Sequence, residues 1–197
     1  MQIKVENLNF VYGKGTAFEQ YALKNVSFQV EEGEFLGIIG HTGSGKSTLI
    51  QHLNGLIRAT EGKIYFQDQD IYAKDFEMKK LRQKVGLVFQ YPEHQLFEAD
   101  VLSDVSFGPK NQGLSAQEVL ERAKESLELV GIPKEMYTKS PFEISGGQKR
   151  RVAIAGVLAM HPQVLILDEP TAGLDPKGRD EIFEQILKLR ENLHMTV

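Results

Sequence analysis

The 197-residue chain carries 23 Lys and Arg against 27 Asp and Glu, a formal net charge of −4, and 41% of its residues are hydrophobic. The length and the apolar content favour one sizeable globular domain. The near-even charge balance gives no support to bulk nucleic-acid binding. The chain has no Cys, which excludes disulfides and thiolate chemistry and is typical of a reducing compartment. Its opening residues alternate like a strand rather than a secretory leader, and its longest apolar runs are too short to cross a bilayer, so any membrane role is expected to require a partner.

The first third of the chain predicts strands followed by a strand, loop and helix. Apolar and polar residues alternate over 3–8 and 26–30, which indicates half-buried strands of an antiparallel sheet. The continuous apolar run 35–39 is typical of a strand buried on both faces. Apolar residues at helical spacing predict a helix over 47–56, and 62–66 predicts one more strand.

The remainder of the chain predicts two buried strands that flank a helical region. The strands are the apolar runs 85–89 and 164–167, and the region 92–160 is predicted to be mostly helical. Ser115 and Glu118 have the spacing of a capping box. An amphipathic helix is expected over 180–193, and a further strand is expected to start at Met195. The residues predicted to face inward on that helix are Ile182, Phe183, Ile186, Leu187 and Leu193.

Residues 40–48 (Gly-His-Thr-Gly-Ser-Gly-Lys-Ser-Thr) match the phosphate-binding loop G-x-x-x-x-G-K-[ST]. Its glycines let successive backbone N–H groups, with the positive end of the next helix, hold the β- and γ-phosphates. Lys46 would add a charge on the phosphates, Ser47 would ligate Mg²⁺, and Thr48 would reach the α-phosphate. An ordinary glycine-rich turn is disfavoured because a strand precedes the loop and a helix follows it. The predicted nucleotide-binding residues here are Gly40, His41, Thr42, Gly43, Ser44, Gly45, Lys46, Ser47 and Thr48.

Two carboxylates follow the apolar run that ends at Leu167. Asp168 is expected at the carboxyl edge of a parallel sheet, where it would hold the Mg²⁺ shell. Glu169 would act as the general base that polarises the attacking water, and is the predicted catalytic residue. A solvated acidic pair at a strand end is the alternative, which the P-loop motif disfavours. Asp175, one loop later, is expected to organise a dimer face.

A glycine-rich turn, Ser145-Gly-Gly-Gln148, opens the helix that runs toward Met160. It predicts a second anion site, which the chain's own phosphates cannot occupy if the P-loop already holds them. A dimer in which each such turn covers the partner's γ-phosphate resolves this conflict. The basic run Lys149-Arg150-Arg151 is interpreted as a solvated helix face.

These motifs, in this order, resemble those of ABC ATPases over the full chain. Residues 144–148 (Ile-Ser-Gly-Gly-Gln) are similar to their signature, Gln90 to their Q-loop glutamine and Tyr12 to the aromatic residue that stacks on adenine. The resemblance implies that ATP and Mg²⁺ are bound and that Gln90 reaches the metal shell. Tyr12 as a packing residue and Gln90 as a solvated strand end are the alternatives. The signature residues implied to bind nucleotide are Ser145, Gly146, Gly147 and Gln148.

The stretch 89–97 (Phe-Gln-Tyr-Pro-Glu-His-Gln-Leu-Phe), with 13–21 and 146–156, resembles the ATPases of energy-coupling factor (ECF) and cobalt-type importers, in particular the second ATPase paralogue. The resemblance implies a second ABC ATPase subunit as partner, in a heterodimer or a homodimer, with a transmembrane scaffold subunit, a substrate-binding membrane subunit and no nucleic acid. It places the chain peripherally on the cytoplasmic side of the cell membrane. Leu96 and Phe97 are expected either in the core or on a docking patch.

The predicted fold class is α/β, with a P-loop NTPase (RecA-like) core. The single ABC ATPase domain, 1–197, is divided into an antiparallel β-subdomain (1–35), the core (36–90 and 163–197) and a helical signature subdomain (91–162). The predicted function is ATP hydrolysis that energises import of vitamins or metal ions. The alternatives are another ABC importer ATPase, a soluble ABC ATPase of translation or DNA repair, and a nucleotide-gated binding module without turnover.

The resemblance also implies a switch histidine at the end of the strand that starts at Met195. The chain stops at Val197, and His194 lies before that strand. We therefore expect a truncated domain that lacks this histidine and the C-terminal part.

Overall fold

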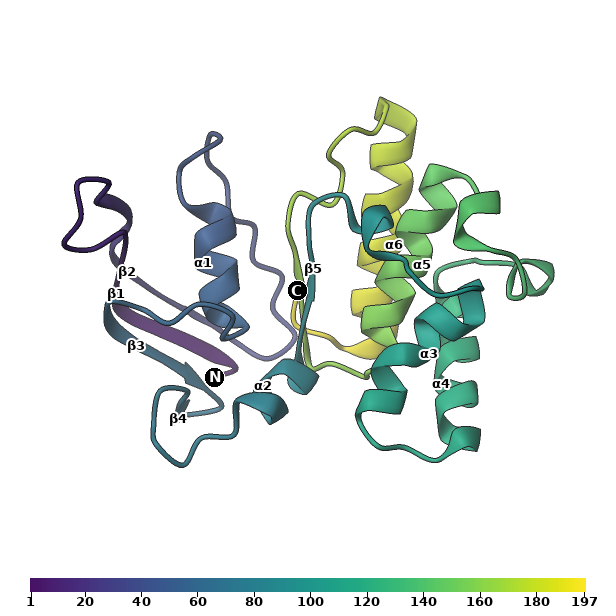
Figure 1. The fold of residues 1–197 in the computed structure, drawn as a ribbon, viewed down its shortest axis with the longest axis horizontal. Helices are drawn as coiled ribbons and strands as arrows, with labels where there is room; N and C mark the ends of the chain where they lie inside the picture. The colour runs from purple at the N-terminus through teal and green to yellow at the C-terminus, as the bar shows by residue number, and fades with distance from the viewer. The chain divides into compact units, whose positions relative to one another are not determined.

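The computed structural model describes all residues, 1–197, and divides the chain into two compact units. Unit 1 comprises Met1–Val85 with Thr196–Val197, and unit 2 comprises Gly86–Met195. Figure 1 labels their helices and strands.

Unit 1 is built around a four-stranded antiparallel sheet in the order β2-β1-β3-β4. Ile3 pairs with Val30 on one side and with Phe66 on the other, so β1 is central to the sheet. The half-buried strands predicted at the start of the chain are confirmed. The elements of unit 1 are β1 (Ile3–Tyr12), β2 (Gln20–Val30), α1 (Lys46–Leu53), β3 (Glu61–Phe66), β4 (Gln69–Asp70) and α2 (Met78–Lys84). The first residue of β5 (Val85–Val88) also belongs to unit 1, and the rest of that strand belongs to unit 2.

A register shift in β1 keeps its apolar residues on the core face. Val5 and Leu8 are both buried although they are three residues apart, and the pairing with both neighbours slips between them. Asn7, between them, adopts a φ of 48°, and Gly62 on β3 approaches its backbone so closely that a Cβ would clash with the Asn7 oxygen. The extra residue of this irregularity restores the inward phase of the strand.

The prediction of a strand buried on both faces over residues 35–39 is wrong. The segment forms no regular strand, and its apolar side chains are exposed, that of Ile39 by 99%. Leu36 N donates to Val197 O at 2.8 Å, and Val197 N donates to Glu34 O at 2.9 Å. Val197 thus pairs with this segment, in agreement with the strand predicted to start at Met195.

Unit 2 packs its helices around one hydrophobic core that includes Val105, Leu127 and Ile154. β5 and β6 form a two-stranded sheet. The predicted helical region between 92 and 160 is confirmed, and Figure 1 shows α6 beside α5. The elements of unit 2 are the end of β5, the 3₁₀ turn η1 (Pro92–Gln95), α3 (Val101–Asn111), α4 (Ala116–Leu129), the 3₁₀ turns η2 (Lys134–Met136) and η3 (Pro141–Glu143), α5 (Gly146–Leu158), β6 (Val164–Leu167) and α6 (Pro176–Leu193).

The inward face predicted for the last helix is only partly correct. α6 starts earlier than predicted, because Asp175 caps it by accepting a hydrogen bond from Gly178 N at 2.8 Å. Ile182 and Ile186 are buried as predicted, together with Leu189, which completes the i, i+4, i+7 stripe. The remaining predicted inward residues are exposed: two lie outside this stripe, and the third continues it beyond Leu189. Those exposed residues are Phe183, Leu187 and Leu193.

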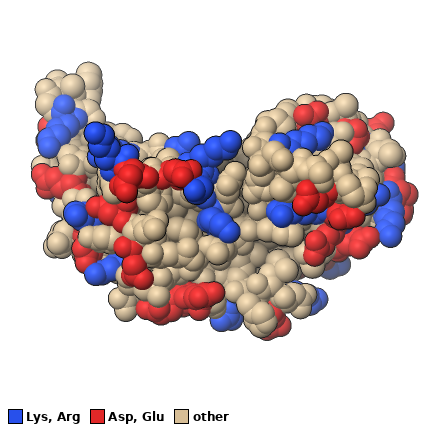
Figure 2. Space-filling model, turned by 90° about the horizontal axis from the view of Figure 1, so that it is seen from below, with Lys and Arg blue, Asp and Glu red and all other residues tan.

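The charged side chains are interspersed in sign over the face that Figure 2 shows, with no broad area of one charge. This distribution is typical of a surface without a strong single-sign field. No helix of the structure combines the length and the apolar character needed to span a bilayer.

Candidate nucleotide site

The P-loop bends at positions that exclude a side chain. Gly43 and Gly45 have φ values of 81° and 92°, in the left-handed region that favours glycine. A Cβ on Gly45 would lie 2.5 Å from Ala22 O, and a Cβ on Gly40 would lie 2.5 Å from Ser44 Oγ. The positive φ values favour glycine at both 43 and 45, and at 45 the Ala22 carbonyl also leaves no room for a side chain.

The positive end of α1 opens directly from this loop. Gly45 is its N-cap and provides no side-chain hydrogen bond, while Ser44 N donates to His41 O at 3.1 Å to close a turn. Lys46 folds back over the loop, because its Nζ donates to Gly40 O at 2.8 Å and to His41 O at 3.1 Å. A helix N-terminus without a side-chain cap, with a lysine lying over it, suits a phosphate group.

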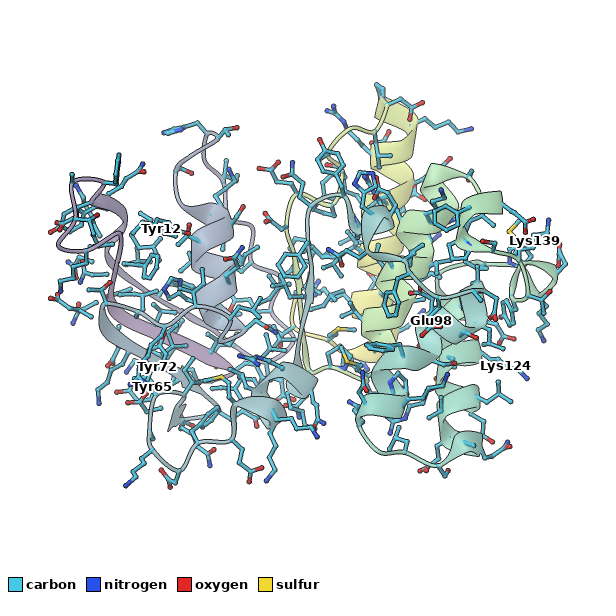
Figure 3. The ribbon with its side chains drawn as sticks, in the orientation of Figure 1. Tyr12, Tyr65, Tyr72, Glu98, Lys124 and Lys139 are labelled. Atoms are coloured by element: carbon cyan, nitrogen blue, oxygen red, sulfur yellow. The ribbon has the colours of Figure 1, made fainter.

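Tyr12 ends β1 and lies beside α1 (Figure 3). Its hydroxyl is 3.2 Å from Thr48 Oγ1 in the first turn of α1, and its side chain is 43% exposed. Phe10 supports it edge-on with a ring-centroid distance of 4.8 Å, and also packs against His52 at 4.7 Å. An aromatic ring that lies beside α1 and is open to solvent can stack on a base.

The predicted catalytic edge lies in unit 2, where β5 and β6 end. Asp168 N donates to Val88 O at 2.9 Å, and Asp168 is buried, with 8% of its surface exposed. Gln90 Nε2 donates to Glu169 Oε2 at 3.3 Å. Glu169 holds a φ of 48°, unusual for a residue other than glycine, which is a strain often found at functional sites. The Gln90 amide and the Glu169 carboxylate therefore meet at this edge, and the backbone of Asp168 is hydrogen-bonded to the neighbouring strand there.

The predicted site residues fall in both units. Tyr12 and residues 40–48 belong to unit 1, whereas Gln90, the two carboxylates and residues 145–148 belong to unit 2. No group of three or more His, Asp or Glu side chains could hold a metal ion alone. The Mg²⁺ site predicted at Ser47, Gln90 and Asp168 accordingly stays a prediction.

The signature turn forms a reciprocal cap at the start of α5. Ser145 Oγ accepts from Gln148 N at 3.3 Å, and Gln148 Oε1 accepts from Ser145 N at 2.9 Å. A Cβ on Gly146 or on Gly147 would meet nothing within 4 Å. Packing within this chain therefore does not explain these two glycines, and they leave backbone open to an incoming group.

The interpretation of the run 149–151 as a solvated helix face is wrong for Arg150, which is 2% exposed. It forms an ion pair with Glu93 of η1, with Nη2 and Oε1 2.9 Å apart. The sequence does not predict this pairing because the two residues are 57 positions apart. Two features of the sequence could have indicated this ion pair: an acidic residue inside the Q-loop stretch 89–97 and the run of basic residues directly after the signature.

Comparisons with known proteins agree with this geometry. A family model described as "ABC transporter" matches residues 23–172. The chain therefore belongs to the ABC transporter family, whose ATP-binding subunits are ATPases.

Within that family, the chain is similar to proteins named energy-coupling factor transporter ATP-binding protein EcfA2. It is 60% identical to the one from Caldanaerobacter subterraneus subsp. tengcongensis over 99% of this chain and 68% of the relative. The corresponding values for the Clostridium acetobutylicum protein are 58%, 100% and 69%. The resemblance to ECF transporter ATPases is confirmed.

Solved structures show the same fold. The chain matches cbiO1 from Clostridium perfringens, described as part of the ABC transporter complex cbiONQ, with a TM-score of 0.87 and 45% identity over 98% of this chain and 75% of that one. It also matches the ATP-binding cassette MJ0796, solved as a dimer bound to ADP and Pi, with a TM-score of 0.85 and 35% identity over 99% and 85% of the two chains. The predicted P-loop NTPase fold of ABC type is confirmed.

Proposed function

We propose that this chain binds Mg²⁺ and ATP on residues 40–48, hydrolyses ATP with Glu169 as general base, and thereby energises import of vitamins or metal ions through an ECF-type membrane complex. The observation that carries the hydrolytic part is the contact between Gln90 and Glu169 at the ends of β5 and β6. The names of its relatives, which are ATP-binding proteins of ECF transporters, support the transport part.

The P-loop supplies the binding energy for the phosphates. Its glycine-dependent bend aims the N-terminus of α1 and Lys46 at one place, and charge-assisted hydrogen bonds from such donors are strong. Tyr12 would stack on the adenine beside Thr48. The oxygen donors Ser47, Gln90 and Asp168 fit the hard cation Mg²⁺, which when bound would neutralise charge on the phosphate oxygens.

Glu169 would accept a proton from the attacking water. The Gln90 amide donates to one oxygen of this carboxylate and so orients the group toward its role as proton acceptor. The same glutamine follows β5 and precedes η1, so a shift of η1 would move the partner of Glu169. This arrangement offers a path by which docking at the Q-loop could change the rate of hydrolysis.

The signature turn would complete the nucleotide site of a second ATPase subunit. The open backbone at Gly146 and Gly147, at the positive end of α5, supports this role. So does the dimeric, ADP- and Pi-bound state in which the similar cassette MJ0796 was solved. The partner would be a related ABC ATPase or a second copy of this chain.

A transmembrane scaffold subunit and a substrate-binding membrane subunit are the proposed membrane partners, which would place the chain peripherally on the cytoplasmic side of the cell membrane. The similar protein cbiO1 is described as part of such a transporter complex. Phe97 is 62% exposed and packs edge-on against Phe107, whereas Leu96 is partly buried against the core. The phenylalanine pair supports a docking patch beside the Q-loop.

The Lys46→Ala variant tests nucleotide binding. Removing the ammonium group is expected to weaken ATP binding and lower turnover by about 10²-fold or more, the range for loss of one preorganised charge contact. Titration with a fluorescent ATP analogue and a phosphate-release assay measure the two effects. Lys149→Ala, which removes a lysine from α5, is the matched control, and equal ATP affinity for Lys46→Ala and the parent would refute the assignment of this loop.

A further inference from the structure

Arg150 is a buried cation that connects distant segments of unit 2. It lies in α5, and its side chain is 3% exposed. Nε donates to Glu93 Oε2 at 3.1 Å, and Nη2 donates to Glu93 Oε1 at 2.9 Å, a two-pronged ion pair. This geometry matches the planar fork of a guanidinium to a carboxylate. The pair therefore fixes η1 to α5.

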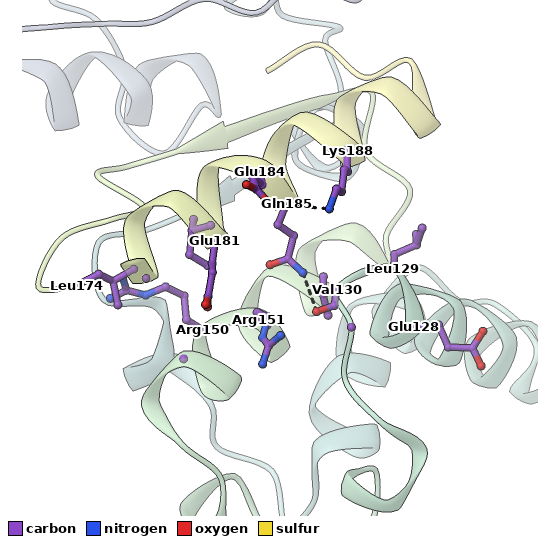
Figure 4. Close-up of a pocket in the computed structure, with 14 residues that line it drawn as sticks. Glu128, Leu129, Val130, Arg150, Arg151, Leu174, Glu181, Glu184, Gln185 and Lys188 are labelled. Carbon is purple, nitrogen blue, oxygen red and sulfur yellow. Dashed lines mark hydrogen bonds and ion pairs between the residues drawn. The ribbon is translucent and has the colours of Figure 1, made fainter. Parts of the chain in front are cut away.

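The same guanidinium also holds the loop that follows Glu169. Nη1 donates to Pro170 O at 3.1 Å, and Nη2 donates to Ala172 O at 3.0 Å. Ala172 N in turn donates to Glu169 O at 2.9 Å, so the loop is a closed turn whose outer carbonyls face Arg150. Figure 4 shows Arg150 beside Leu174, at one end of a cavity of about 540 Å³.

The two segments that Arg150 holds also touch each other. Tyr91 adopts a φ of 53° at the start of η1, and its ring lies so close to Gly173 that a Cβ there would be 3.3 Å from Tyr91 Cε1. Burial alone would raise the pKa of the Glu93 carboxyl, but the hydrogen bonds and charge of Arg150 outweigh it and hold that pKa below its usual range. The carboxylate is thus ionised and paired at neutral pH.

Each of these segments carries a residue of the proposed site. The signature serine is the N-cap of α5, η1 follows Gln90, and the closed turn begins at Glu169. We propose that Arg150 is a positioning residue that joins the signature helix to the catalytic edge of the same chain, so that engagement of Ser145 by a partner's nucleotide is transmitted to Gln90 and Glu169. This inference rests on the proposed function.

Arginine is suited to this role in a way that lysine is not. The contacts require donors in one plane toward Glu93 and toward two backbone carbonyls, and only a guanidinium presents such a fork. A lysine at this position would keep the charge opposite Glu93 but could not maintain all four hydrogen bonds. Arg150→Lys therefore separates the positioning role from simple charge pairing.

Hydrogen exchange of the parent and of Arg150→Lys is the first test, and it does not depend on ATP hydrolysis. Backbone amides in peptides covering 90–97 and 168–175 are expected to exchange at least about 10-fold faster in the variant, while those of α4 stay unchanged. Arg151→Met removes a cation from the same helix without removing any of the four bonds, and is expected to leave both peptides protected. Unchanged protection in Arg150→Lys would overturn the inference.

Steady-state kinetics with Mg²⁺, ATP and a partner ATPase subunit form the second test. Arg150→Lys is expected to lower kcat by about 10- to 100-fold, the scale for a slightly misplaced catalytic group, with KM for ATP changed less than about twofold. The double variant Arg150→Met with Glu93→Leu replaces the ion pair by apolar groups, a change that buried pairs often tolerate. It is expected to keep its melting temperature and lose kcat in the same way.

The outcomes separate the possible explanations. Parental kcat in Arg150→Lys, or in a folded double variant, would overturn the inference, as would a kcat loss that only follows a loss of folded protein. Failure of the parent itself to hydrolyse ATP with its partner would instead refute the proposed function, and the hydrogen-exchange comparison would then decide the role of Arg150 alone.

Discussion

His52 couples the stability of unit 1 to pH. It is fully buried, its Nδ1 lies 2.7 Å from Thr48 O, and its ring packs edge-on against Phe10. Burial lowers the pKa of this imidazole, and the hydrogen bond to Thr48 only partly opposes the shift. The folded chain therefore resists protonating His52, whereas the unfolded chain takes up a proton as the pH falls through about 6.5.

The free energy of unfolding is accordingly expected to fall as the pH decreases from 7.5 to 5.5, by at most about 1.4 kcal/mol per pH unit from this group. Below the lowered pKa of the folded state the loss levels off. His52→Gln, which does not titrate, is expected to lose less stability over this window in urea denaturation followed by circular dichroism. His194→Gln, at an exposed position, serves as the control, and identical pH profiles for the parent and His52→Gln would contradict the account.

At the residue scale, the sequence predicted the local motifs and missed the long-range pair. The P-loop residues and Glu169 are recognisable because their chemistry is written in contiguous runs. The local pattern predicts a solvated Arg150 because the partners of this residue are 57, 20 and 22 positions away, and no local pattern shows that a charged side chain will be buried. A buried ion pair is specified by the packing of α5 against η1, which the sequence alone does not reveal.

Helix α4 is stabilised at its N-terminus by a capping box. Ser115 Oγ accepts a hydrogen bond from Glu118 N at 3.3 Å, and Glu118 Oε2 accepts one from Ser115 N at 3.0 Å, as the spacing predicts. Ser115→Ala is expected to lower the free energy of unfolding by about 1 kcal/mol, the usual effect of losing an N-cap. Chemical denaturation measures it, with Gln117→Ala in the same turn as the control, and a neutral Ser115→Ala would show that packing alone holds α4.

At the scale of elements, the sequence predicted which segments are helices or strands better than it predicted which faces are buried. Ile182 and Ile186 of α6 are predicted to be buried, and they are. The sequence predicts burial for residues 35–39 and for Phe183 and Leu187 of α6, yet all of them are exposed. The periodicity of the sequence predicts which face of a helix or strand is apolar, but whether that face is buried depends on which other segments pack against it.

For the whole molecule, the central expectation is a composite site shared between two ATPase subunits. Ser145→Arg adds a bulky cation at the opening of α5 and is expected to block ATP-driven dimerisation while the chain still binds ATP. Sedimentation velocity with and without Mg²⁺ and ATP, in the presence of the partner, measures closure. Ser145→Ala, which loses the same helix cap without added bulk, controls for the cap, and dimerisation of Ser145→Arg at the parental level would show that the signature does not act across the dimer.

The most direct measurement is the ATPase rate of Glu169→Gln beside that of the parent, with the partner subunit present. Glutamine keeps the size of the side chain and removes the proton acceptor, so Mg²⁺ and ATP binding and the melting temperature are expected to persist. Hydrolysis at this chain's site is expected to fall by about 10²-fold or more, and ATP-bound dimers should accumulate. A parental rate in a folded, ATP-binding Glu169→Gln variant would contradict the account, because the base would then lie elsewhere.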